Sequence, residues 1–326
     1  MIKFFRSIIA TVALTIVTFT AMSQGINGRT STFVVPYPAG GPSDFVARTI
    51  QTDLTKHLGQ QVVIDNVGGA GGAIGIQKVL QTRTDGSAFV LASPSDLILA
   101  PLFVSAIKYK PEDLRLAGLV MNSSLALLVR PTIDAKNLDE LLAKARQPGA
   151  KELSFGSSGV GSLYHLAGEV FAKKAGIKML HVPYKGGAPL IADLMGGQID
   201  MTFLPLAGNI PELIKSKKVL MLGVAAVAQH PMFPDAPALA AMKPFDGFVF
   251  DVWAGVLVPK KTPDSAVQKL NEAISASTSN VEVRRAFEAT GSMAGKQMSV
   301  QELEKFYASD IARYQGIVKA ANIPTQ

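Results

Sequence analysis

Short apolar runs rich in β-branched residues alternate with segments of helical spacing along most of this chain, and that alternation limits its fold more than any other feature. Apolar runs of four to eight residues predict buried strands, and apolar residues three or four positions apart predict a helix face. Strands are predicted at 32–35, 61–65, 87–93, 125–131, 153–158, 179–184, 200–206, 219–226 and 248–259. Helices are predicted at 45–58, from the end of the glycine-rich segment at 68–75 to Leu80, at 137–146, 163–175 and 188–195, and over most of 263–321. This alternation indicates an α/β fold.

A short motif occurs twice in the chain, and we call this repeat the sequence echo. Val-Pro-Tyr at 35–37, followed by Gly-Gly at 40–41, returns at 182–184, followed by Gly-Gly at 186–187. A length of 326 residues suggests about two domains, and the echo predicts equivalent turns in two similar domains. Both turns follow a predicted strand, and open α/β sheets bind ligands at the carboxyl ends of their strands. A three-residue match can also arise by chance.

The first 23 residues have the layout of a secretory signal peptide. Lys3 and Arg6 precede an uncharged, mostly apolar stretch at 8–20, and Ala21-Met22-Ser23 has the small-x-small pattern of a cleavage site. The apolar stretch is too short, and too rich in threonine, to span a bilayer. We expect cleavage after Ser23 and a soluble exported protein. The alternative is an uncleaved amphipathic N-terminus.

Charge and cysteine content limit which ligands, nucleophiles and metal sites are possible for this chain. Lys and Arg exceed Asp and Glu by 32 − 25 = 7, but no basic run is longer than two residues. Such a dispersed excess suits a small anionic ligand at least as well as a nucleic acid. The chain has no cysteine, which excludes disulfides, thiolate nucleophiles and thiolate metal sites. The four histidines show no metal-ligand spacing, so no metal site is predicted; they are His57, His165, His181 and His230.

Glycine-rich segments raise the question of a nucleotide cofactor. The segment 68–75 resembles a dinucleotide-binding loop, but no register of it supplies G-x-G-x-x-G. No P-loop pattern occurs in the chain either. We interpret the segment as a tight turn between a strand and a helix, and we predict no cofactor.

The stretch FVVPYPAGGPSDF at 33–45 leads a strand into a turn that carries almost no reactive side chains. Glycines before a helix leave backbone N–H groups unpaired near its positive end, where a carboxylate can approach them closely. One interpretation is therefore an anion site on the amides of 39–41. The other is an ordinary helix start in which Ser43 or Asp44 caps the first turn.

The stretch SFGSSGVGSLYH at 154–165 offers a second candidate site. Ser157, Ser158 and Ser162 can donate hydroxyl hydrogen bonds while nearby amides face the same anion. An enzyme would instead use one of these serines as a nucleophile with His165 as its base, which makes a secreted serine hydrolase the alternative function. The hydrolase motif G-x-S-x-G is absent, and no carboxylate is evidently placed to orient the pair.

Six segments, in order, resemble signatures of the periplasmic receptors of tripartite tricarboxylate transporters, the Bug or TctC family. They are PYPAGGPSDFVARTI, LGQQVVIDNVGGAGGAIG, TDGSAFVLAS, FGSSGVGSLYHLAGEVF, HVPYKGGAPLIADLMGGQIDMTF and WAGVLVPKKTP. Each is moderately specific, and together they extend the resemblance to essentially the whole mature chain. Asn-Val-Gly stands at 66–68, where many relatives have Asn-Arg-Pro-Gly, so no role for a charge at position 67 is expected.

The resemblance implies a two-domain periplasmic binding protein fold of the Venus-flytrap type. Each domain is then a mixed sheet flanked by helices, the domains are joined by crossing strands, and the cleft between them closes on the ligand. After the signal peptide at 1–23, we expect residues 24–123 and about 249–300 to form domain 1. Residues 124–248 are expected to form domain 2, and 301–326 a C-terminal helical segment.

The resemblance also implies a function. We expect a monomeric periplasmic receptor, not an enzyme, that captures a small organic mono- or dicarboxylate and delivers it to the membrane subunits of a transporter, with no cofactor, metal or nucleic acid. The expected ligand-binding residues are Tyr37, Ala39, Gly40, Gly41, Asp44, Ser93, Ser157, Gly159, Ser162, His165, Tyr184 and Asp200. Asp200 can equally serve only to cap a turn.

Overall fold

The computed structural model describes residues 30–321, so the predicted signal peptide lies outside the described residues. Its strands are β1 (Ser31–Val35), β2 (Val62–Asn66), β3 (Ala88–Ala92), β4 (Leu114–Val129), β5 (Leu153–Ser157), β6 (Met179–Pro183), β7 (Met201–Pro205), β8 (Leu220–Val224), β9 (Asp251–Pro259) and β10 (Met293–Ala294). Its helices are α2 (Pro42–Leu58), α3 (Ala73–Leu80), α4 (Ala100–Phe103), α5 (Leu138–Ala145), α6 (Leu163–Ala175), α7 (Gly187–Met195), α8 (Ile210–Lys215), α9 (Asp264–Ser279), α10 (Val281–Glu288) and α11 (Val300–Ala321). Shorter helical turns are η1 (Ala70–Gly72), η2 (Ser95–Leu99), η3 (Pro111–Asp113) and η4 (Leu239–Ala241).

The ten described strands form one mixed sheet, in the order β2-β1-β3-β9-β4-β7-β5-β6, with β8 and β10 also paired to β4. β1 runs parallel to β2 and β3 at one end of the sheet, and β5 runs parallel to β6 and β7 towards the other. In the middle, β4 and β9 are antiparallel to each other and to their neighbours. The predicted mixed α/β architecture is therefore confirmed.

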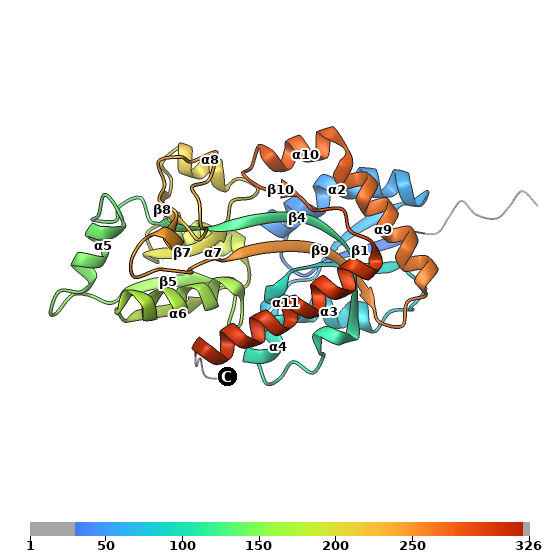
Figure 1. The fold of residues 1–326 in the computed structure, drawn as a ribbon, viewed down its shortest axis with the longest axis horizontal. Helices are drawn as coiled ribbons and strands as arrows, with labels where there is room; N and C mark the ends of the chain where they lie inside the picture. Colours follow the sequence, from blue (N-terminus) through green and yellow to red (C-terminus); the bar gives the residue numbers. More distant parts are fainter. Residues whose placement is uncertain (1–29, 322–326) are drawn as a thin grey trace, which may run out of the picture.

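The long strand β4 belongs to both halves of the sheet, and it runs with β9 through the centre of Figure 1. β4 pairs with β9 from Leu114 to Ser124, and with β7 from Leu125 onwards. The sequence pattern predicts a strand only from Leu125. The residues before it include Gly118 and a polar run ending at Ser124, which interrupt the apolar pattern although β9 supplies a hydrogen-bonding partner there.

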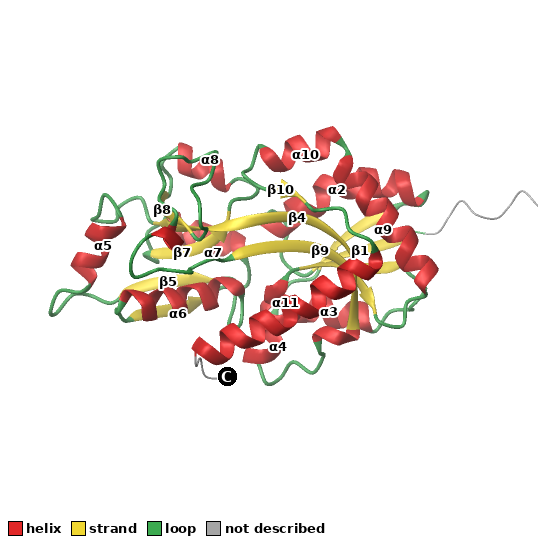
Figure 2. Ribbon diagram, viewed as in Figure 1, coloured by secondary structure: helices red, strands yellow, loops and turns green. Residues whose placement is uncertain are grey.

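Helices cover both faces of the sheet (Figure 2). In β1, Phe33 and Val35 pack in one buried cluster with residues of α2 and α9, whereas Val34 packs on the opposite face with residues of α3 and α4. Successive strand residues point to opposite faces, so a parallel strand covered on both sides needs a continuous apolar run. The run at 33–35 meets that requirement.

The C-terminal helix α11 lies across the strands that join the two halves, as Figures 1 and 2 show. Its Asp310 accepts a hydrogen bond from Trp253 Nε1 on β9 at 2.7 Å. Its Tyr307 donates to the backbone oxygen of Pro111 at 3.0 Å. Further along, α11 also contacts α6, so one helix touches elements of both halves.

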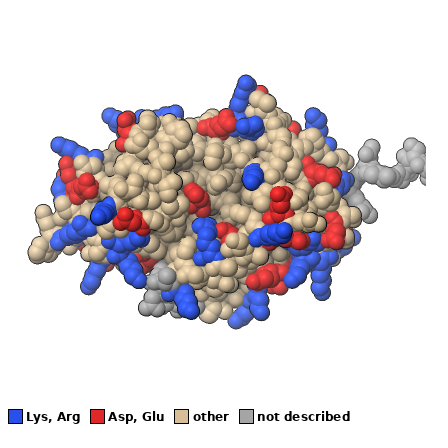
Figure 3. All heavy atoms as spheres, in the orientation of Figure 1, with Lys and Arg blue, Asp and Glu red and all other residues tan. Residues whose placement is uncertain are grey.

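Charged side chains of both signs are interspersed over the face shown in Figure 3. In the described part of the chain, no helix is both long enough and apolar enough to cross a membrane. The surface in that view therefore agrees with the dispersed charge of the sequence.

Candidate functional site

Turns from the two halves of the sheet meet at the carboxyl ends of their parallel strands. A methyl group placed on Gly186, after β6, would approach Pro38 Cδ, after β1, to 3.0 Å. One placed on Gly159, after β5, would lie 3.4 Å from Gly71 Cα, after β2. The two Val-Pro-Tyr turns of the sequence echo therefore face each other. Such an edge is where α/β sheets bind their ligands.

Asp44 organises the β1–α2 turn. Its carboxylate accepts hydrogen bonds from the backbone N–H of Gly40 (3.0 Å), from Arg48 Nε (2.8 Å) and from Asn66 Nδ2 (3.0 Å). The side chain is buried, and the helix begins after Gly41 with no side-chain cap. Asp44 therefore fixes the turn from inside the helix and is not the N-cap residue.

The charge on Asp44 is set by these donors. Burial raises the pKa of the Asp44 carboxyl, but the hydrogen bonds from Arg48, Gly40 and Asn66 outweigh it and hold the pKa below its ordinary value. The carboxylate is therefore ionised at neutral pH, which is the form that accepts all three hydrogen bonds.

The amides of this turn divide into two groups. The N–H of Gly40 is occupied by Asp44, so it is not a free donor for an anion in this structure. Within residues 30–321, the N–H groups of Ala39 and Gly41 donate no hydrogen bond. Gly40 contributes its conformation instead, because its φ of +81° lies in the left-handed region that favours glycine.

A buried network joins the β1, β2 and β3 turns. The Tyr37 hydroxyl lies 3.2 Å from the backbone oxygen of Gly71 and 3.3 Å from Asp96 Oδ1. Asp96 also accepts from the backbone N–H and the hydroxyl of Ser93. Burial raises the pKa of Asp96 to about 7 despite these donors. Burial, followed by the charge of Asp96, raises the pKa of Tyr37 well above its ordinary value.

Asp96 was absent from the sequence predictions, although Tyr37 and Ser93 were among them. The sequence carried a usable signal, because Ser-x-x-Asp before an apolar run is the capping-box pattern, in which the acidic side chain accepts from the backbone N–H three residues earlier. The structure thus brings the two predicted residues together through an unpredicted carboxylate.

The β5–α6 turn uses two of its predicted donors internally. The Ser157 hydroxyl lies 3.0 Å from the oxygen and 3.2 Å from the nitrogen of Gly159, and 2.7 Å from His181 Nε2. The Ser162 hydroxyl accepts from the backbone N–H of His165 and thereby caps α6. Both hydroxyls hold the turn in shape.

Ser158 is different, because its hydroxyl is buried and has no hydrogen-bond partner in the described part of the chain. A buried hydroxyl without a partner loses the free energy of its hydrogen bonds to water, so such a group calls for a partner. Ser158 is therefore the hydroxyl of this turn that no described group of the protein uses.

His165 does not pair with any of the predicted serines through its ring. The His165 ring accepts at Nδ1 from the Gly161 amide, and its Nε2 lies 3.6 Å from Glu169, so it does not hydrogen-bond a serine hydroxyl. His181 is the histidine that contacts a serine, but that serine, Ser157, is completely buried. The predicted combination of His165 with a nucleophilic serine is not formed, because the turn directs that ring to a backbone amide.

Tyr184 stays at the β5–α6 turn through its backbone, whereas Asp200 lies away from the other predicted residues. The Tyr184 amide donates to the Ser157 oxygen, but its hydroxyl donates to Asp193 on α7 at 2.8 Å. Asp200 precedes β7 and pairs with Arg130 at 2.9 Å and with Ser154 near the start of β5. The structure does not bring Asp200 to the other site residues, because it lies at the amino ends of strands whose carboxyl ends carry the turns.

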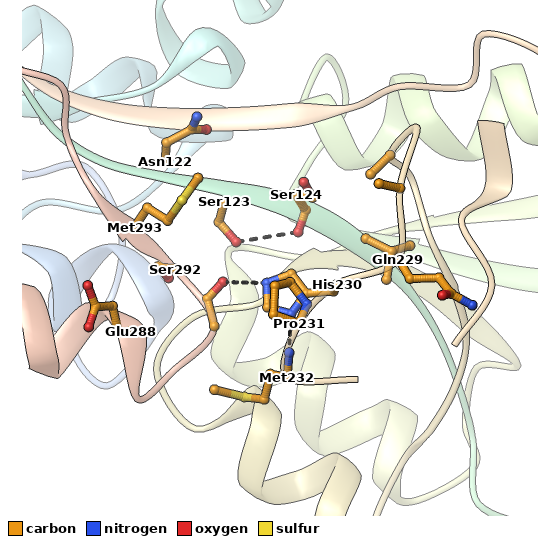
Figure 4. Close-up of a pocket in the computed structure, with 14 residues that line it drawn as sticks. Asn122, Ser123, Ser124, Gln229, His230, Pro231, Met232, Glu288, Ser292 and Met293 are labelled. Carbon is orange, nitrogen blue, oxygen red and sulfur yellow. Dashed lines mark hydrogen bonds between the residues drawn. The ribbon is translucent and has the colours of Figure 1, made fainter. Parts of the chain in front are cut away.

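A separate cavity of about 550 Å³ lies between the two halves beside β4, and Figure 4 shows Ser123, His230 and Ser292 around it. None of the predicted site residues lines it. His230 hydrogen-bonds the Gly291 oxygen at 2.9 Å, which links residues of the two halves. Among the described residues, no group of three or more histidines and carboxylates is placed to hold a metal ion.

Comparison with known proteins gives consistent results. The model of the "Tripartite tricarboxylate transporter family receptor" family matches residues 46–323. The chain is similar to the solved periplasmic binding protein BugD (28% identity, TM-score 0.86, 92% of this chain and 100% of that one). It is similar to Rhodopseudomonas palustris MatC with bound malate (27% identity, TM-score 0.83, 90% of this chain and 100% of that one). It is also similar to R. palustris Rpa4515 with adipate (29% identity, TM-score 0.85, 91% of this chain and 99% of that one). The predicted two-domain periplasmic binding protein fold is thereby confirmed.

Proposed function

Since the chain belongs to the family of tripartite tricarboxylate transporter receptors, as its six signature segments predicted, we propose that it captures a small organic carboxylate between the facing turns. It then delivers this carboxylate to the membrane subunits of such a transporter. The family is one of periplasmic solute-binding proteins, which are not enzymes.

The observation that carries the proposal is a set of unused donors on both sides of the turn contact. The Ala39 and Gly41 amides are unpaired within residues 30–321 and stand at the start of α2, whose N-terminal end favours an anion. On the other side, the Ser158 hydroxyl is buried without a partner in the described chain. A carboxylate has two oxygens that accept hydrogen bonds, so one such group can use donors from both halves.

The solved neighbours narrow the ligand class. MatC was solved with malate and Rpa4515 with adipate, and both are short dicarboxylic acids. We propose that this chain takes a mono- or dicarboxylate of similar size, held at one carboxylate by the donors above. Tyr37, Asp44, Ser157 and Ser162 then support the turns, and Ser158 joins Ala39 and Gly41 as a direct contact.

Capture requires that the halves separate and close. We propose that domain 1 comprises residues 24–123 and about 249–300, that domain 2 comprises 124–248, and that they move about β4 and β9. The bond from the Leu163 amide to Ser95 Oγ, at 2.9 Å, connects turns of the two proposed domains, so it would have to break when they separate.

The test is a thermal-shift screen of the mature protein against malate, adipate and shorter mono- and dicarboxylates. A carboxylate present at 100 times its Kd should stabilise the protein by about 2.7 kcal/mol. Scattering in solution should show compaction with the same compound. Absence of a shift with every carboxylate would contradict the proposal, and hydrolysis of a test ester that depends on Ser157, Ser158 or Ser162 would favour the enzyme instead.

Ser158→Ala sharpens the test. Losing a hydrogen bond to a charged ligand should weaken binding by about tenfold to a hundredfold, because such bonds contribute about 1.5–3 kcal/mol. The free variant should be as stable as the wild type or more so, since a buried unpaired hydroxyl is removed. Ser265→Ala, on the exposed start of α9, is the matched control and should change neither quantity.

Export is the remaining part of the proposal. We propose that residues 1–23 direct secretion and are removed, so that the mature periplasmic protein begins at Gln24. N-terminal sequencing of the protein from a periplasmic extract checks this. An intact Met1 in the cytoplasmic fraction would contradict it.

A further inference from the structure

The Ser157 hydroxyl is the structural centre of the β5–α6 turn, and a histidine from the next strand contacts it. Ser157 lies within hydrogen-bond distance of both backbone groups of Gly159 and of His181 Nε2, the last at 2.7 Å. β5 and β6 are parallel and in register, with Phe155 beside His181. The ring therefore reaches the last residue of β5 from the neighbouring strand.

Aromatic stacking fixes the orientation of that ring. His181 stacks on His165 with ring centroids 4.0 Å apart and an interplanar angle of 16°, and on Phe155 at 4.9 Å and 26°. His165 in turn accepts the Gly161 amide at Nδ1. The two stacked histidines thus contact the turn at both ends, His181 at Ser157 and His165 at Gly161.

The backbone between those ends needs such support. Gly159 and Gly161 have φ of +137° and +78°, and the unpaired Ser158 hydroxyl lies beside them. Glycine loses more conformational freedom on ordering than any other residue, so a turn with two glycines is held only by its contacts. Two of those contacts run to histidine rings.

We propose that His181 is a positioning residue for ligand capture: through Ser157 it holds the β5–α6 turn so that the Ser158 hydroxyl meets the bound carboxylate. The ligand part of this inference rests on the proposed function. Nothing in the sequence motif around the turn includes His181, which lies 24 residues beyond Ser157.

The protonation state of the ring fits this role. Burial, followed by the charge of His165, lowers the pKa of His181 to about 4, while Glu169 acts in the opposite direction. The ring is therefore neutral at neutral pH, with one donor and one acceptor nitrogen. An amide can replace such a group, so glutamine is the conservative substitute and alanine the disruptive one.

Hydrogen exchange of the ligand-free protein tests the positioning directly. In His181→Ala, the Gly159 and Gly161 amides should exchange about twofold to tenfold faster, with smaller changes elsewhere, because loss of one hydrogen bond costs about 0.5–1.5 kcal/mol locally. His181→Gln should restore most of the protection. His57→Ala, an exposed histidine near the end of α2, is the matched control and should change nothing in the turn.

Ser157→Ala removes the same contact from the other side and serves if His181→Ala fails to fold. In the double variant, loss of His181 should add little to the loss of Ser157, because both act through one hydrogen bond. Unchanged exchange at Gly159 in folded His181→Ala, or fully additive effects in the double variant, would overturn the proposal.

Calorimetry with malate and adipate adds the ligand readout. His181→Ala should weaken binding of whichever probe the wild type binds by about tenfold, and His181→Gln should recover it. Wild-type affinity in a folded His181→Ala variant would overturn the ligand part. A wild type that binds neither probe would count against the proposed function, whereas the exchange experiment would still decide whether His181 holds the turn.

Discussion

Asp44 is a residue whose role its sequence neighbours do not reveal. A serine or aspartate after Gly-Gly and before an apolar helix face is typical of an N-cap, and that was one of the two interpretations of this turn. In the structure, the carboxylate reaches back to Gly40 and sideways to Asn66 on β2. The bond to Asn66 depends on the pairing of β1 with β2, which no local pattern contains.

Asp44→Asn should destabilise the protein by about 1.5–3 kcal/mol, because hydrogen bonds to a buried charge are lost and one amide hydrogen is turned towards a donor. Urea unfolding at pH 7 measures this. Asp139→Asn, on the exposed first turn of α5, is the control and should change the free energy of unfolding little. Equal stability of Asp44→Asn and wild type would show that the residue is no more than a helix-start residue.

The two glycines of the same turn should respond differently to alanine. Gly40→Ala has open space around its Cβ but a φ of +81°, so it should cost about 1–2 kcal/mol of folding free energy. Gly41→Ala has a φ of −89° and ordinary contacts with Pro38 and Ala188, so the fold should tolerate it. Its methyl group lies between the facing turns, however, and should weaken carboxylate binding. Melting temperatures and calorimetry separate the two effects, and equal behaviour of both variants would contradict this.

Asp96 should make stability depend on pH in an unusual direction. Its pKa is about 7 in the folded protein, against an ordinary value of 3.8, so the folded state holds the proton more tightly than the unfolded state. The stability contributed by Asp96 therefore falls as the pH rises from about 4 to about 7. Asp96→Asn removes this dependence, so its stability relative to wild type should rise over that window. Urea midpoints from pH 4 to pH 8 measure the difference, and parallel curves would contradict the prediction.

At the scale of elements, the sequence predicted most strands and helices but not where a strand changes partners. Nine apolar runs became strands, and the tail proved helical, because those segments carry their own periodicity. Two other segments carry no such periodicity, namely the first part of β4, through Gly118 to Ser124, and the turn η2 with α4. These segments take their structure from neighbours, β9 in the first case and α6 with α11 in the second.

The attachment of α11 can be tested at its buried hydrogen bond. Trp253 is the single tryptophan of the chain, and Asp310 accepts its indole N–H. Asp310→Ala should cost about 1–3 kcal/mol, because a buried donor is left without a partner. Tryptophan fluorescence during urea unfolding reports both the stability and the environment of the ring. A variant with wild-type emission and midpoint would show that α11 does not depend on this bond.

For the whole molecule, the order of the strands in the sheet could not be read from the sequence. The fold class followed from the alternation of elements, and the two-domain arrangement followed from the resemblance of six ordered segments. The repetition of Val-Pro-Tyr suggested equivalent turns in two similar domains, but that these turns face each other is known only from the structure. Contacts such as Ser157 with His181 remained hidden, because they depend on the register of parallel strands and on ring stacking.

The place of β9 between β3 and β4 determines the order in which the molecule can fold. Val90 pairs with Leu257, which closes a chain loop of 257 − 90 = 167 residues, whereas β5 and β6 pair across a short helical connection. The entropy of closing a loop grows with its length, so long-range pairings form late. Pulse-labelled hydrogen exchange during refolding should therefore protect the amides of β6 before those of β9. Nearly the whole chain must therefore be available before the first half of the sheet can be completed. Earlier protection of β9 would contradict this order and would mean that the pairing of β3 with β9 nucleates folding.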